Sequence, residues 1–173
     1  MKKFIILVLF LVNGLSVSCQ ESLISASSRP GNSINLNLLG RASSVTLTYE
    51  RLFPVSEFFL IATDFGGGYG KEIELGIDST GTNKPPTYLV IPHQVSFNIG
   101  KGRSFLEAGI GGTATIGNVY PHYIWFPVVG YRFQPLSSGN MKVRLYGNFL
   151  TVNTNNFRNI FFTPFGLSLG YCF

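Results

Sequence analysis

The last eight residues of the chain, GLSLGYCF (166–173), alternate strictly between two kinds of side chain. Leu167, Leu169, Tyr171 and Phe173 fall on one parity, whereas glycine, serine and cysteine occupy the other. A period of two is typical of a β-strand with one apolar face and one small or polar face. We therefore expect the chain to end inside a strand, on an aromatic ring.

The rest of the chain repeats this alternation, and turn residues divide it into eight expected strands. They span residues 33–40, 43–53, 57–70, 86–100, 104–117, 123–134, 141–152 and 160–173. The weakest division lies at residues 40–42, where the alternative is one long bent strand over 33–53. Because no segment shows a helical period, the sequence predicts an all-β, antiparallel, up-and-down fold.

The first 19 residues have the organisation of a secretory signal peptide. Lys2 and Lys3 precede an apolar run, residues 4–12, that is too short to cross a bilayer as a helix. We expect cleavage after Cys19, with lipid attachment at Cys19 as the alternative. Residues 20–32 are then a polar periplasmic lead-in, and the barrel occupies residues 33–173.

The composition is unusual for an exported globular domain. Charged residues make up 12% of the chain, about half the usual share, and aromatic residues make up 14%. Without Lys2 and Lys3 the formal net charge falls from +5 to +3, which is too small to indicate a nucleic-acid partner. No long apolar run follows residue 20, so a membrane-spanning segment would have to be a strand.

Three features favour an eight-stranded transmembrane barrel over a soluble, secreted β-sandwich that acts as a binding module. Most expected strands have about 10–14 residues, which suits a tilted bilayer crossing better than a globular strand. Short and long connections alternate, as they do in outer-membrane barrels. Aromatic residues also gather near the strand ends and are expected to form two girdles. One girdle comprises Tyr49, Phe53, Phe105, Tyr131, Phe133, Tyr171 and Phe173, and the other comprises Tyr69, Tyr88, Tyr120, Tyr123, Trp125 and Phe161.

Four segments resemble small eight-stranded outer-membrane barrel proteins of Gram-negative bacteria. They are VTLTYERLF (45–53), GKGRSFLEAGIG (100–111), GYRFQP (130–135) and the closing GLSLGYCF. Many such proteins carry no assigned activity, so the resemblance implies architecture and an outer-membrane location, with membrane lipid as a partner. It also implies insertion by the barrel-assembly machinery, which reads the terminal strand. Tyr171 and Phe173 match the aromatic positions of this signal. The signal also tends to have glycine six residues from the end, where this chain has Ser168, with Gly166 and Gly170 on either side of it.

Charged residues on the inward parity are expected to meet inside the barrel. Glu50, Glu107, Arg132 and Arg144 fall at about one height near the periplasmic rim, with Lys142 at their edge. Eight strands leave an interior that side chains can fill, and buried charges persist when they are paired. The sequence therefore predicts a neutral network that plugs the lumen, and the alternative is a narrow pore or ion-conducting channel.

The sequence offers little chemistry for catalysis, cofactors or metals. The two histidines, His93 and His122, have no serine and carboxylate at useful spacing, so we expect no enzyme activity. Calcium-loop spacing is absent around Glu72, Glu74 and Asp78, and we expect no cofactor or metal. The loop over 71–86 is the best candidate for contact with an unknown surface partner. Its apolar residues Ile73, Leu75 and Ile77 suggest an exposed hairpin edge.

Overall fold

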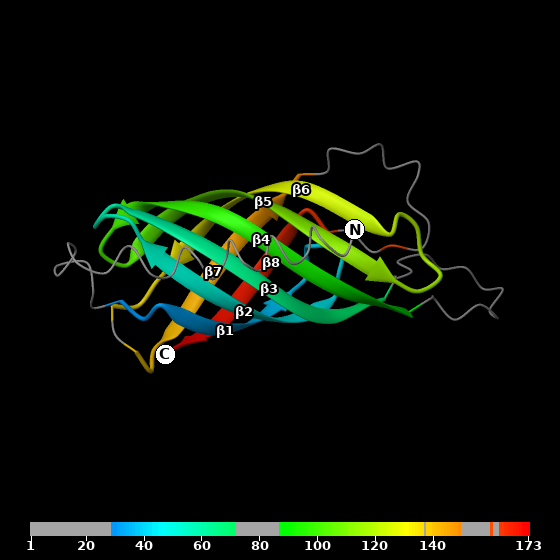
Figure 1. Cartoon of the computed structure of the whole chain (residues 1–173), viewed down its shortest axis with the longest axis horizontal. Coiled ribbons are helices and arrows are strands. Elements are labelled where there is room, and N and C mark those ends of the chain that lie inside the picture. The colour runs from blue at the N-terminus through cyan, green and yellow to red at the C-terminus, as the bar shows by residue number, and fades with distance from the viewer. Residues whose placement is uncertain (1–28, 72–86, 137, 150–159, 161–162) are drawn as a thin grey trace, which may run out of the picture.

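The computed structural model describes residues 29–71, 87–136, 138–149, 160 and 163–173, and these residues form eight strands. The strands are β1 (Asn32–Leu38), β2 (Val45–Pro54), β3 (Phe59–Lys71), β4 (Thr87–Lys101), β5 (Ser104–Ile116), β6 (Tyr123–Phe133), β7 (Met141–Asn148) and β8 (Phe165–Cys172). Each strand pairs antiparallel with the next, and β8 pairs with β1, so the sheet is a closed up-and-down barrel (Figure 1). The all-β barrel prediction is confirmed, and the sandwich alternative is wrong.

The described residues contain no helix long and apolar enough to cross a membrane.

The barrel closes where its first and last strands, β1 and β8, meet. The β1–β8 register runs from Ser33 opposite Cys172 to Leu38 opposite Leu167, and Asn32 and Phe173 exchange two backbone hydrogen bonds. Both ends of the barrel sequence therefore lie at one end of the barrel, which we call the terminal end. The connections after β1, β3, β5 and β7 leave from the opposite end, which we call the loop end.

The weakest predicted division is a real turn between β1 and β2. Leu39, Gly40, Arg41 and Ala42 have φ values of 62°, 73°, 54° and 55°, so four successive residues are left-handed. The left-handed conformation costs an L-residue about 1–2 kcal/mol, so three of these four residues need contacts that hold them there. The turn folds inward, and Arg41 and Ala42 are buried. The alternative of one bent strand over 33–53 is wrong.

The predicted strand ends agree with the structure to within two residues, except around the connection from β7 to β8. β7 ends at Asn148, and the predicted extension to 152 runs into residues outside the described part. β8 begins at Phe165 rather than at residue 160. The residue before it, Pro164, has no backbone N–H to donate to a ladder, although its carbonyl accepts a hydrogen bond from the Asn148 backbone N–H at 2.7 Å.

The distribution of polar and apolar side chains over the two faces of the strands is the reverse of that in a water-soluble barrel. The apolar parity faces outward, where Phe165, Leu106 and Ile110 are 72%, 69% and 64% exposed. The polar parity faces the lumen, and most of the buried polar side chains of the described strands lie there. The period of two seen at residues 166–173 therefore extends around the whole sheet, with its apolar side outermost.

Two members of the predicted girdles lie inside the barrel instead. Tyr88 and Phe105 are only 2% and 1% exposed. Phe105 shares its parity with Glu107, so it faces the lumen, and the Tyr88 hydroxyl donates a hydrogen bond to the carbonyl of Ala42. Position near a strand end was therefore a poorer guide than parity. Phe161 lies outside the described residues.

Inward-facing glycines make room for the large rings that fill the lumen. A Cβ atom at Gly166 on β8 would overlap the ring of Tyr146, and one at Gly111 on β5 would overlap the ring of Phe126. These rings occupy space that neighbouring side chains would otherwise need. The Tyr146 ring thus explains why Gly166, on the small parity of the closing sequence, has no side chain.

Candidate functional site: a chain of alternating charges in the lumen

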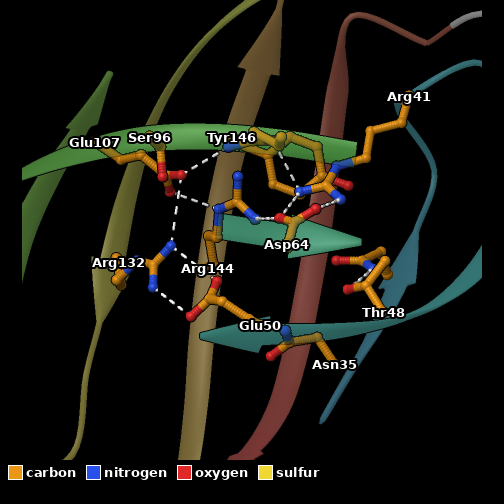
Figure 2. A network of polar contacts seen from close by, with 12 residues as sticks. Asn35, Arg41, Thr48, Glu50, Asp64, Ser96, Glu107, Arg132, Arg144 and Tyr146 are labelled. Atoms are coloured by element: carbon orange, nitrogen blue, oxygen red, sulfur yellow. Dashed lines mark hydrogen bonds and ion pairs between the residues drawn. The ribbon is translucent and has the colours of Figure 1, made fainter. Parts of the chain in front are cut away.

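Seven charged side chains are buried together inside the barrel. All are 7% exposed or less, and they come from the β1–β2 turn and from five strands: Arg41, Glu50, Asp64, Glu107, Arg132, Lys142 and Arg144. Figure 2 shows most of them converging in the lumen between the strands that carry them. They form one continuous chain in which positive and negative groups alternate.

The part of this chain nearest the loop end begins at the β1–β2 turn. The Arg41 guanidinium donates two hydrogen bonds to the Asp64 carboxylate, at 2.9 and 2.7 Å, and one to Gln94 Oε1 at 2.8 Å. Arg144 also reaches Asp64, with Nη1 3.3 Å from Oδ2, and its Nε donates to Glu107 Oε2 at 2.5 Å (Figure 2). Gln94 Nε2 donates to the other Glu107 oxygen at 2.9 Å, which closes this part into a ring.

The part nearest the terminal end continues through Arg132. Its Nη2 lies 3.5 Å from Glu107 Oε1, and its two terminal nitrogens donate to the two oxygens of Glu50 at 2.7 and 3.0 Å. Lys142 Nζ donates to Glu50 Oε1 at 2.7 Å and to Ser33 Oγ at 2.9 Å. Each of the three carboxylates in this series of ion pairs therefore has two cationic partners, as a charge removed from water requires.

The structure brings all five predicted lumen residues into this chain, and Lys142 is at its end. It also adds two residues that the sequence reading missed, Asp64 and Arg41. Asp64 has the same parity as Leu60 and Ala62 on β3, and this parity was the available signal. Arg41 lies in a turn, where parity carries no information.

The predicted neutral balance is wrong for the described residues. Four cations face three carboxylates, so the chain of charges has a formal excess of one positive charge. The four residues predicted to share one height are paired directly with one another, and the two added residues, Asp64 and Arg41, extend the chain of charges to the β1–β2 turn at the loop end. The strand-borne groups alone are balanced, and Arg41 supplies the excess.

Apolar layers lie on both sides of the charges. Toward the loop end, Ala42 of the turn packs in a buried cluster with rings and aliphatic side chains that include Tyr88, Ile124, Phe126 and Tyr146. Toward the terminal end, a smaller buried cluster contains Leu52, Leu60, Ala62 and Phe105. Buried apolar side chains therefore fill parts of the lumen on both sides of the central ion pairs.

Residues 29–31, the described part of the lead-in before β1, lie at the terminal end of the barrel. The Gly31 carbonyl accepts a hydrogen bond from the Leu52 backbone N–H at 2.7 Å. The Arg29 guanidinium lies 4.9 Å from the centre of the Phe105 ring. Arg29 thus lies against the terminal-end apolar cluster.

The residues of the predicted assembly signal divide between the two faces of β8. Tyr171 and Phe173 are exposed on the outer face, whereas Gly166 and Gly170 face the lumen. Gly166 packs under Tyr146, and a Cβ atom at Gly170 would overlap Asn35 Oδ1. Both glycines therefore have a packing role, and recognition by an assembly machinery stays a prediction.

The remaining predicted positions contribute no further site among the described residues. His93 lies on the outer face and shares a 2.8 Å hydrogen bond with the Tyr123 hydroxyl, while Ser96 is buried in the lumen, as their odd spacing predicted. In the described part of the chain, no group of three or more His, Cys, Asp or Glu side chains is placed to hold a metal ion. The loop residues Ile73, Leu75 and Ile77 lie outside the described residues.

Comparison of the chain with protein-family models, with curated proteins and with solved structures found no match.

Proposed function

We propose that this protein is an outer-membrane β-barrel of a Gram-negative bacterium, with a plugged lumen and a structural or surface-interaction role. The observation that carries the proposal is the inversion of the two faces. Large apolar side chains cover the outside, and ion pairs fill the inside. In water such an outer face is unfavourable, because soluble proteins rarely expose apolar patches of this extent. In lipid the same face is favourable, and a closed barrel leaves no backbone edge unpaired.

The exposed aromatic residues support this orientation in a bilayer. Tyr49, Tyr131 and Tyr171 lie on the outer face toward the terminal end, and Tyr69, Tyr123 and Trp125 lie on it toward the loop end. Tyr and Trp favour the boundary between lipid and water, where a ring and a polar group are both accommodated. The proposal places the terminal end in the periplasm and the loop end at the cell surface.

The lumen supports a plug more than a channel. The alternating charges are paired and buried across the lumen, and apolar side chains pack beside them, so an ion would have to break a paired network to pass. The role of the protein is then carried by its loop end or by the barrel as a membrane element, and we propose no catalysis. Insertion by the barrel-assembly machinery, with Phe173 at the end of the signal, is part of the same proposal.

Two measurements test this function. Cells are fractionated, and the protein from the outer membrane is run on gels with and without boiling. We expect recovery in the outer-membrane fraction and a different mobility before boiling. Recovery in the soluble fraction with identical mobilities would contradict the membrane assignment.

Planar-bilayer recordings then separate the plug from the pore. We expect the folded protein to insert without steady conductance. Steady channels that disappear in a Glu107→Gln variant would favour the pore, because Glu107 bridges two cations in the lumen.

A further inference from the structure

The β1–β2 turn, residues 39–43, differs from the other parts of the lumen filling because no strand carries it. The turn is hinged at Leu38 and Val45, the last cross-strand pair of β1 and β2. Next to this pair, the Leu39 N–H donates a 3.0 Å hydrogen bond to the Ser44 carbonyl. Beyond this hinge the turn bends into the barrel and places Ala42 in the loop-end apolar cluster. It can therefore move as a unit without unpairing any strand.

Side chains of the barrel wall hold the inward position through the backbone of the turn. The hydroxyl groups of Tyr146, Thr113 and Tyr88 donate to the carbonyls of Leu39, Arg41 and Ala42, at 3.1, 2.9 and 3.0 Å. These bonds come from β7, β5 and β4, on different sides of the lumen. They satisfy the turn's carbonyls in its left-handed conformation, which the chain would not hold without such contacts.

The side chain of Arg41 occupies a binding site in which three groups contact its guanidinium. Asp64 accepts two hydrogen bonds in a fork, Gln94 Oε1 accepts a third, and the Tyr146 ring lies 5.3 Å from the guanidinium carbon (Figure 2). A forked carboxylate beside an aromatic ring suits a planar guanidinium better than an ammonium. Asp64, Gln94 and Tyr146 all belong to strands, so this binding site does not depend on the turn that carries Arg41.

The charge balance favours a turn that can leave. With Arg41 inside, four buried cations face three carboxylates. With Arg41 outside, three face three, and Asp64 keeps Arg144 as its partner. Arg132, Lys142 and Arg144 are fixed in strands. Among the four cations of the ion-paired series, Arg41 is therefore the one that can return to water without disrupting the sheet.

We propose that the turn 39–43 is a displaceable plug, and that Arg41 occupies a guanidinium-binding site which a guanidinium group from outside the chain can take in its place. Displacement opens a vestibule at the loop end, because Ala42 leaves the apolar cluster. The strand-borne ion pairs and the terminal-end cluster stay in place, so the vestibule is closed below and does not conduct. The ligand class is a planar cation such as a free guanidinium or the arginine side chain of a peptide.

Trypsin tests the displacement, because Arg41 is itself a cleavage site and is 1% exposed in the plugged state. The folded protein in vesicles is treated with trypsin, and cleavage after Arg41 is followed by mass spectrometry. We expect slow cleavage in the wild type. In Asp64→Asn, which removes the fork and leaves two cations facing each other, we expect it to be at least about tenfold faster.

Glu50→Gln is the matched control. It also removes a buried carboxylate with two cationic partners, but it lies at the other end of the chain of charges and does not contact Arg41. Faster cleavage in Asp64→Asn alone, with the heat-modifiable mobility retained, supports the plug. Equal acceleration in both variants would mean general loosening of the barrel, and unchanged cleavage in Asp64→Asn would mean a fixed turn; either result would overturn the proposal.

Methylguanidinium tests the site itself. In Arg41→Ala the binding site no longer holds the Arg41 guanidinium. Millimolar methylguanidinium should bind there and raise the melting temperature of this variant. Tetramethylammonium at the same ionic strength should not, and Arg41→Ala combined with Asp64→Asn should show no rise with either cation. Equal effects of the two cations, or no effect of methylguanidinium on Arg41→Ala, would overturn the guanidinium site.

Discussion

The outer face and the lumen of this barrel are built by the same strands and differ in almost every physical respect. On β5, Leu106, Ile110 and Ile116 point outward and are exposed, while Glu107 between them points inward and is fully buried in an ion-paired chain. Burial here does not follow hydrophobicity, which is the reverse of the usual rule for water-soluble domains. This distribution is the one that the proposed membrane location requires, because lipid is less polar than an ion-paired interior.

Removing a lumen carboxylate tests the inner half of this comparison and has the largest expected effect. Glu107→Gln leaves four buried cations with two carboxylates, and we expect it to lower the free energy of unfolding by about 3–5 kcal/mol. Urea unfolding from lipid vesicles measures this. Lys142→Met is the control, because it leaves three cations and three carboxylates, and Glu50 keeps its forked partner Arg132. A loss in Lys142→Met as large as in Glu107→Gln would show that charge balance is unimportant here.

Placing a charge on the outer face tests the other half. Ile110 is the middle residue of β5 and points outward, so in a bilayer Ile110→Arg should cost about 2–4 kcal/mol. Ile116→Arg, on the same face at the loop end of the same strand, should cost about 0–1 kcal/mol. The same unfolding experiment compares the two. Equal, negligible costs would mean that the middle of the outer face meets water.

Adding one methyl group to each face gives the smallest of these differences. In Gly166→Ala the new Cβ atom overlaps the Tyr146 ring in the filled lumen, and we expect a loss of about 1–3 kcal/mol. In Gly67→Ala, on the outer face of β3, the nearest atom is a backbone oxygen 4.0 Å away, so we expect almost no change. A tolerated Gly166→Ala would show that the lumen is packed more loosely than the structure indicates.

The sequence predicted the fold well because the period of two survives in most strands. Parity alone predicted which face of β2, β5, β7 and β8 is apolar, and it brought Glu50, Glu107, Arg132 and Arg144 together. It worked less well on β3, where Gly66, Gly68 and Gly70 occupy the inward parity and Asp64 is the one polar side chain of that face.

Other features of the site could not be predicted from parity. Arg41 belongs to a turn whose inward fold depends on contacts with three distant strands. Tyr88 and Phe105 were assigned to the girdles by their closeness to strand ends, although parity already indicated the lumen for Phe105. Alternation also shows that the two faces of a strand differ without showing which face points outward or what surrounds the barrel.

Trp125 allows a direct measurement of what surrounds the barrel, because it is the single tryptophan of the chain and lies on the outer face of β6, 47% exposed. The protein is folded into vesicles that contain lipids with brominated acyl chains, and its fluorescence is compared with that in unbrominated vesicles and in iodide solution. The account predicts strong quenching by the brominated chains and weak quenching by iodide. Strong quenching by iodide with none by the brominated lipid would contradict it, because the outer face would then be in water.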